Sequence, residues 1–148
     1  TTIGIGGHAL TLAVQKHFGV TEAEARKIKA ERGIVPAPGN EDYLAAMLST
    51  VSAIRDEIST RLDYWQEKAK TSTTQTPVTH AILVGGNASV RGLPEYLEGA
   101  LKVPVVAGDV FTNLASLDTW IPMLDYTESL AYATAIGLAL RDDIQSYA

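Results

Sequence analysis

Residues 81–88 read AILVGGNA, and this stretch decides the predicted fold because a buried strand runs into a bend that requires glycine. The apolar, partly β-branched run over residues 78–84 predicts a strand covered on both faces. Gly85 and Gly86 end this strand, since glycine adopts backbone angles closed to other residues and lets a ligand approach the chain. A helix with Pro94 in its first turn is predicted to follow. This order is typical of a nucleotide-binding crevice, and a tight strand–helix turn without a ligand has the same pattern.

The composition is that of a globular protein and argues against several functional classes. Apolar residues make up 46% and charged residues 20% of the 148 residues. The formal net charge is -5 and no segment concentrates Lys and Arg, which argues against nucleic-acid binding. The sequence contains no cysteine, so disulfides and thiolate metal sites are excluded. His8, His17 and His80 lack the spacing and carboxylate partners of a metal site, and no metal ligand is predicted.

No segment of the sequence predicts a transmembrane helix or a secretory signal. The longest nearly apolar run, residues 130–140, is too short to span a bilayer. Residues 1–5 read TTIGI, so the chain starts without Met and within a strand-like run. We therefore expect it to be a piece of a longer protein.

The first half of the chain has the periodicity and the caps of helices. Residues 8–18 carry apolar side chains at helical spacing, and Gly19 follows as a C-terminal cap. Thr21 and Glu24 form a capping box, which predicts a second helix as far as about Glu31, with Gly33 as its stop.

The longest predicted helix begins at Asn40, which we expect to be its N-terminal cap. Apolar residues at steps of three and four define its predicted core face, and they are Leu44, Met47, Leu48, Val51, Ile54, Ile58, Leu62 and Trp65. A polar link without core residues, residues 71–77, follows and is the predicted hinge or boundary.

A second short strand is predicted over residues 103–106, beginning or lying at an edge because Pro104 cannot donate a ladder hydrogen bond. Residues 111–126, which include Trp120, predict a loop packed against the body. The last helix, capped by Asp125, is expected over residues 127–142, and its small residues would allow close approach to a sheet.

The order of these elements predicts an α/β fold in which a helical block is inserted into a sheet layer. Residues 1–7 would be the end of a strand and its turn. Residues 8–76 would be the inserted helical subdomain, and residues 77–148 the sheet subdomain with the glycine bend and the C-terminal helix.

Four stretches resemble a known family: IGGHALT at residues 5–11, EARKIKAERG at 24–33, ILVGGNASVRGL at 82–93 and YATAIGLALR at 132–141. In their order and spacing they are similar to the actin-like ATPases, and within these to the C-terminal portion of PilM-like type IV pilus assembly proteins, relatives of the cell-division protein FtsA. The resemblance implies a fragment of an actin-like, ribonuclease-H-like ATPase domain with an inserted helical subdomain.

The resemblance also implies that residues 85–88 form the adenosine motif. Gly85 and Gly86 would let the backbone approach the ribose and the first phosphate, and Asn87 and Ala88 would turn the chain. Asn87 stands where the family usually has a third glycine, but asparagine tolerates left-handed backbone angles better than most residues.

The other wall of the implied adenosine site is the helix that carries Arg26 and Lys29. These two side chains are three residues apart and share a helix face. Lys29 matches the family's basic position, whereas Arg26 departs from the Glu that is usual there. On the residues alone, such side chains on an amphipathic helix are usually solvated.

The resemblance implies binding of ATP, as Mg-ATP in the intact protein. The phosphate and metal loops lie outside these residues, so no catalytic residue is predicted and this piece alone should not hydrolyse ATP, while the intact protein would be at most a weak ATPase. The implied role is a cytoplasmic scaffold of a pilus or secretion platform, peripheral to the inner membrane and joined to a PilN-like tail through the missing first domain. Two alternatives remain: a fragment of an actin-like-fold small-molecule kinase, or a structural interaction module whose nucleotide site has decayed.

Overall fold

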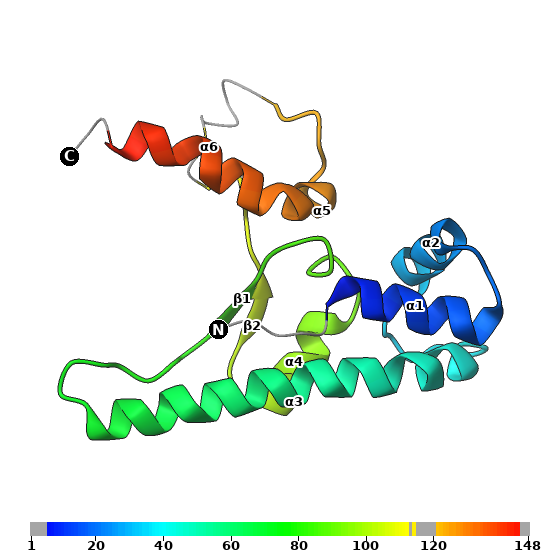
Figure 1. Ribbon diagram of the computed structural model, residues 1–148, viewed down its shortest axis with the longest axis horizontal. Helices are drawn as coiled ribbons and strands as arrows, with labels where there is room; N and C mark the ends of the chain where they lie inside the picture. Colours follow the sequence, from blue (N-terminus) through cyan, green and yellow to red (C-terminus); the bar gives the residue numbers. More distant parts are fainter. Residues whose placement is uncertain (1–5, 113, 115–120, 146–148) are drawn as a thin grey trace. The chain divides into compact units, whose positions relative to one another are not determined.

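The computed structural model describes residues 6–112, 114 and 121–145 and has more helix than strand (Figure 1). The chain divides into two compact units. The described residues of Thr1–Ala81 and Val90–Val105 form the first, here called the helical unit. Those of Ile82–Ser89 and Val106–Ala148 form the second, here called the C-terminal unit. The strand end predicted at residues 1–5 lies outside the described residues.

Helix α1 ends, and helix α2 begins and ends, where the predicted caps place them. Helix α1 spans Gly7–Phe18 and ends at Gly19, whose φ of 66° places it in the left-handed region. Helix α2 spans Glu22–Arg32, and the capping box at its start is present: the Glu24 amide donates to the Thr21 hydroxyl at 3.3 Å, and the Thr21 amide donates to the Glu24 carboxylate at 2.8 Å. Both helices are thus specified by local sequence.

Replacing Thr21 with alanine should destabilise the helical unit by about 1 kcal/mol, because the Glu24 amide then loses its acceptor at the start of α2. Urea unfolding followed by far-ultraviolet circular dichroism measures the difference. Thr73→Ala, in the exposed polar link, is the control and should change nothing.

The stability that this cap contributes should decrease at acidic pH. The hydrogen bonds from the Thr21 amide and hydroxyl lower the pKa of Glu24. A carboxylate with a lowered pKa stabilises the fold above its unfolded-state pKa and loses that contribution as the pH falls through its folded-state pKa. An equal difference between wild type and Thr21→Ala at neutral and strongly acidic pH would contradict a role for Glu24.

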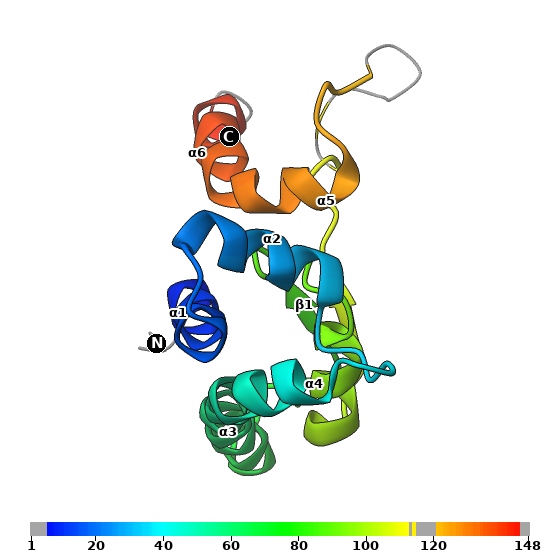
Figure 2. The same cartoon turned by 90° about the vertical axis from the view of Figure 1, so that its right-hand side faces the viewer.

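Helix α1 lies between α2 and α3 and contacts both (Figure 2). Helix α3 spans Glu41–Thr71, and its buried residues are Tyr43, Met47, Val51 and Ala69. The predicted core face was correct at Met47 and Val51 but wrong at Leu48 and Trp65, which are exposed. The buried stripe passes through Tyr43, because the face that contacts α1 is turned by one residue from the stripe of leucines.

Asn40 occupies the N-cap position of α3, but its side chain makes no capping hydrogen bond. Its side-chain nitrogen Nδ2 donates to the Val35 carbonyl at 3.0 Å, and its side-chain oxygen accepts from Arg32 at 3.4 Å. The capping role predicted for the Asn40 side chain was therefore wrong. The buried side chain instead holds the connector between α2 and α3.

A short parallel sheet pairs β1, Ala81–Leu83, with β2, Val105–Ala107. The Ala81 amide donates to the Pro104 carbonyl at 2.8 Å, and the Gly108 amide donates to the Leu83 carbonyl at 2.8 Å. These bonds advance along both strands in the same direction, which defines a parallel pair. The strand predicted over residues 103–106 is present, but β2 begins directly after Pro104, two residues later than predicted.

The strand predicted over residues 78–84 is shorter than expected, and it is not covered on both faces. Ile82 and Val84 are both exposed by more than half, as is Val106 of the neighbouring strand. At Val78 the backbone carbonyl accepts a hydrogen bond at 2.8 Å from the side chain of Gln66 instead of joining a ladder. The apolar run therefore forms a strand with one open apolar face.

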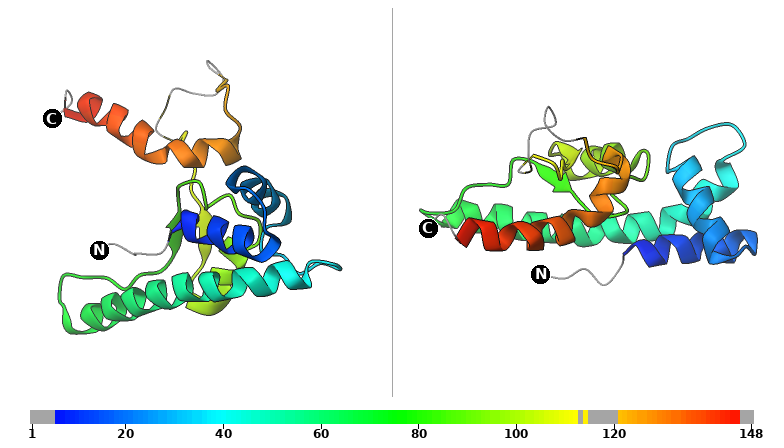
Figure 3. Two further views of the ribbon diagram at one scale, coloured as in Figure 1. Left: turned by 45° about the vertical axis from the view of Figure 1, so that its right-hand side comes forward. Right: turned by 90° about the horizontal axis from the view of Figure 1, so that it is seen from above.

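Helix α4, Leu93–Leu101, follows the glycine bend with Pro94 in its first turn, as predicted. The C-terminal helical run consists of α5, Tyr126–Ser129, the short 3-10 helix η1, Leu130–Tyr132, and α6, Ala133–Gln145, which follow one another without a break (Figure 3). The Asp125 carboxylate accepts from the Glu128 amide at 2.8 Å, which confirms the predicted cap.

Two expectations for the C-terminal unit were wrong. Ile121 and Met123 are exposed, so this described part of the predicted loop does not pack down, while Trp120 lies outside the described residues. Ala135, Gly137 and Ala139 are also exposed, and no atom of any residue that the structure describes lies within 4 Å of a Cβ built on Gly137. These small residues therefore do not bring α6 close to the sheet. Over the described parts of the chain, no helix is both long enough and apolar enough to cross a membrane.

Candidate functional site

The glycine bend after β1 is a tight, internally bonded turn. Gly85 has a φ of 96°, and its amide donates to the Leu130 carbonyl at 2.9 Å. The Ala88 amide donates back to the Gly85 carbonyl at 2.9 Å, and the Ser89 hydroxyl donates to the Gly86 carbonyl at 2.9 Å. The predicted need for glycine at position 85 is confirmed, since other residues rarely adopt this φ. Asn87 does not take a left-handed conformation, so the bend does not depend on its tolerance for one.

Gly86 has no comparable structural need for glycine. Its φ is not positive, and among the described residues a Cβ built on it meets only the Ala131 Cβ, at an ordinary contact distance of 3.7 Å. The backbone at Gly86 thus has no side chain next to it at a position where the methyl group of alanine would fit. Such a position can admit a ligand close to the main chain.

Lys29 is held between helices α2 and α1 and is only partly exposed. Its ammonium group donates to the Thr11 hydroxyl at 3.2 Å, and that hydroxyl donates to the Gly7 carbonyl at 3.1 Å. Burial, and secondly the charge of Arg26, lowers the pKa of Lys29. A partly desolvated cation at a fixed position differs from the solvated lysine that periodicity alone predicts.

Arg26 has a different environment, although it lies on the same helix. Its side chain is 68% exposed, and its guanidinium donates to Glu22 Oε1 at 3.0 Å and 2.5 Å in an i,i+4 ion pair. Arg26 is thus engaged by its own helix, whereas Lys29 is anchored to the neighbouring one. Thr11, which anchors Lys29, was missed as a site residue, although it stands in a stretch that carries the family resemblance.

The six predicted site residues belong to different units. Arg26 and Lys29 lie in the helical unit, while residues 85–88 lie in the C-terminal unit. That the two groups meet around an adenosine stays a prediction. Among the described residues, no group of three or more His, Asp or Glu side chains could hold a metal ion.

Comparisons with known proteins identify the relatives of this fold. A family model described as type IV pilus assembly protein PilM matches residues 2–143. Among solved structures, the chain is similar to one from the "PilM-PilN type IV pilus biogenesis complex", with a TM-score of 0.70 and 20% sequence identity over 93% of this chain. The match covers 37% of that chain, so the present residues span little more than a third of its length. At this identity the match shows a shared fold.

Proposed function

Because the chain belongs to the type IV pilus assembly protein PilM family, we propose that it is part of an ATP-binding scaffold of a type IV pilus or related secretion platform. In this proposal, residues 85–88 and the Arg26–Lys29 face of α2 supply the adenosine side of the nucleotide site. The observation that carries the proposal is the family match over residues 2–143, which includes all these positions.

Two features of the chain support nucleotide binding. The backbone at Gly86 is bare although alanine would fit there, so a close ligand gives a reason for the glycine. The Lys29 ammonium is partly buried and directed by Thr11, and a desolvated cation interacts more strongly with an electron-rich ligand than a solvated one.

The wider assignment rests on the family. We propose that the intact protein has an actin-like fold, binds ATP with Mg²⁺ through loops outside these residues, and works on the cytoplasmic side of the inner membrane. Its partner there would be a PilN-like tail, bound by the first domain. The similar solved structure is that of a PilM-PilN complex, which supports this choice of partner.

Gly86→Ala separates a ligand requirement from a structural one. In the intact protein, we expect ATP affinity measured by calorimetry to fall at least about tenfold, since a methyl group would keep the ribose from the backbone. Stability should change by less than about 0.5 kcal/mol, because the new Cβ makes only an ordinary contact. Gly99→Ala in α4, where the added Cβ also meets nothing within 4 Å, is the control for affinity.

Lys29→Met tests the second wall in the same titration. The substitution keeps the apolar stem but removes the charge, and it should also weaken ATP binding about tenfold, a loss of about 1.4 kcal/mol. Lys27→Met is the matched control, because Lys27 lies on the same helix and is exposed. Unchanged affinity in both Gly86→Ala and Lys29→Met would contradict the adenosine site and favour a structural module without nucleotide.

A further inference from the structure

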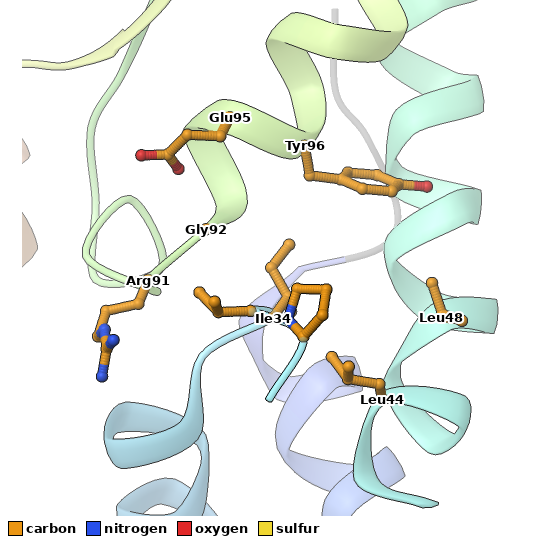
Figure 4. Close-up of a pocket in the computed structure, with 9 residues that line it drawn as sticks. Ile34, Leu44, Leu48, Arg91, Gly92, Glu95 and Tyr96 are labelled. Atoms are coloured by element: carbon orange, nitrogen blue, oxygen red, sulfur yellow. The ribbon is translucent and has the colours of Figure 1, made fainter. Parts of the chain in front are cut away.

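A large open groove lies within the helical unit, formed by the connector after α2, the start of α3 and the start of α4 (Figure 4). Its volume is about 790 Å³. Its apolar lining includes Ile34, Pro36, Leu44, Leu48 and the ring of Tyr96. We call it the Tyr96 groove. Neither Arg26 nor Lys29, the residues of this unit assigned above to the nucleotide, is among the described residues that line it.

The walls of the Tyr96 groove are fixed in place. The Ile34 amide donates to the Arg91 carbonyl at 2.7 Å, which ties the connector to the residues before α4. The Tyr96 hydroxyl accepts from Arg55 at 3.2 Å and lies 3.3 Å from the Ser52 hydroxyl. These bonds attach the ring of Tyr96 to α3, so the groove does not require a partner to form.

The apolar residues of the groove remain exposed in a pattern that suits a helix. Leu44 and Leu48 are four residues apart on α3 and lie along the same side of the groove, and Leu48 is 50% exposed. A ridge of this spacing packs against the apolar face of a second helix. Contiguous exposed apolar surface of this kind marks interaction sites.

Acidic side chains in the groove and beside it indicate which helix fits. Glu95 lines the groove, and Glu41 lines an adjoining hollow that shares Pro36 and Leu44 with it. Neither carboxylate makes an ion pair or a side-chain hydrogen bond with any described residue. Arg91 at the rim donates to the Glu31 carbonyl at 3.4 Å, and its guanidinium points away from Tyr96, while Arg55 donates to the Tyr96 hydroxyl at 3.2 Å. The groove therefore offers unused acidic groups around an apolar floor.

We propose that the Tyr96 groove docks a short amphipathic helix of a partner protein, with an apolar face on Leu44, Leu48 and Tyr96 and with Lys or Arg toward Glu95 and Glu41. A helix suits the site better than a compact ligand, because the groove is open and continues into the hollow beside Glu41. The recognition is the helix-in-groove mode, in which apolar anchors supply affinity and flanking charges supply specificity.

The test is selection of a displayed library of helical peptides on the intact protein. The library varies the residues of one face and keeps the others constant. Enriched peptides should carry apolar residues at i, i+4 and i+7 and more Lys and Arg than the starting library. An enriched peptide should bind Leu48→Ala about tenfold more weakly, whereas Leu12→Ala, another exposed leucine outside the groove, should bind it normally.

A charge swap tests the electrostatic half of the proposal. Glu95→Lys should weaken binding of the enriched peptide about tenfold, and replacing the peptide lysine that faces residue 95 with Glu should restore binding. Asp63→Lys makes the same charge change on the exposed side of α3 and is the control.

Absence of enrichment, or peptides that bind Leu48→Ala normally, would overturn the proposal. Two other outcomes would assign the groove to something other than a partner helix. Self-association of the protein that Leu48→Ala abolishes would assign the groove to a second copy, and binding of a small apolar dye that no peptide displaces would assign it to a small ligand.

Discussion

Gly33→Ala is expected to destabilise the helical unit by roughly 3 kcal/mol, because two separate costs meet at this residue. Gly33 ends helix α2 with φ 63° and ψ −148°, a conformation that is almost restricted to glycine. In addition, a Cβ at this position would lie 2.5 Å from the Arg91 carbonyl oxygen and 2.6 Å from the Arg91 Cβ. That carbonyl is the acceptor for Ile34, so the clash would separate the connector from α4. The measurement is the urea midpoint of the intact protein by circular dichroism.

Gly19→Ala is the matched control for Gly33→Ala. Gly19 also follows a helix with positive φ, 66°, but no atom of the described part of the chain lies within 4 Å of its added Cβ. Gly19→Ala should therefore reduce the stability only by the cost of placing a Cβ at positive φ, about 1 kcal/mol. Equal losses of stability in the two variants would show that the clash with Arg91 does not contribute to the effect of Gly33→Ala.

This comparison also shows what the sequence could predict. Gly19, Gly33 and the Thr21 capping box mark helix ends through interactions within a few residues, so their places could be read directly. The contact of Gly33 with Arg91 joins residues far apart in the chain, and no local pattern predicts it. Asn40 has a different reason: its position was correct, but its side chain binds the nearby Val35 carbonyl rather than the helix, and a capping residue type does not show which of several local partners it binds.

The largest error was the prediction of the core face of α3, because periodicity defines an apolar stripe but does not show which part of the protein covers it. Leu48 and Met47 are neighbours, and either could belong to an apolar face in a helix with apolar residues on more than one side. Packing against α1 buries Met47 and leaves Leu48 open beside Tyr96. The groove therefore arises from a leucine that the pattern assigned to the core.

For the residues of the candidate site, the sequence could predict local backbone conformation but not the environment of a side chain. The positive φ of Gly85 follows from a strand that must turn sharply, and the structure confirms it. The environment of Lys29 depends on Thr11, eighteen residues away, and so distinguishes it from Arg26 only in the folded unit. Nothing in the periodicity of α2 separates these two cations.

Tyr43→Ala is expected to have an effect as large as that of Gly33→Ala, about 3–5 kcal/mol, because it empties the centre of the helical unit. Tyr43 is fully buried, its ring stacks on Phe18 with centroids 6.3 Å apart, and the Arg32 guanidinium lies 5.7 Å from its centroid. Chemical unfolding of the intact protein measures the loss. Tyr64→Ala, an exposed ring on the same helix, should cost far less.

Tyr43→Phe separates the ring from its hydroxyl, which is buried without a hydrogen-bond partner among the described residues. Removing a buried, unsatisfied hydroxyl should leave stability unchanged or raise it by about 1 kcal/mol at neutral pH. Burial raises the pKa of Tyr43 to about 12, opposed by the charge of Arg32, whereas an unfolded tyrosine titrates near about pH 10. The raised pKa stabilises the fold below the unfolded value and is lost as the pH rises through the folded one. The stability of Tyr43→Phe relative to wild type should therefore increase as the pH rises above about 10. If both proteins lose the same stability at alkaline pH, the hydroxyl is not buried as described.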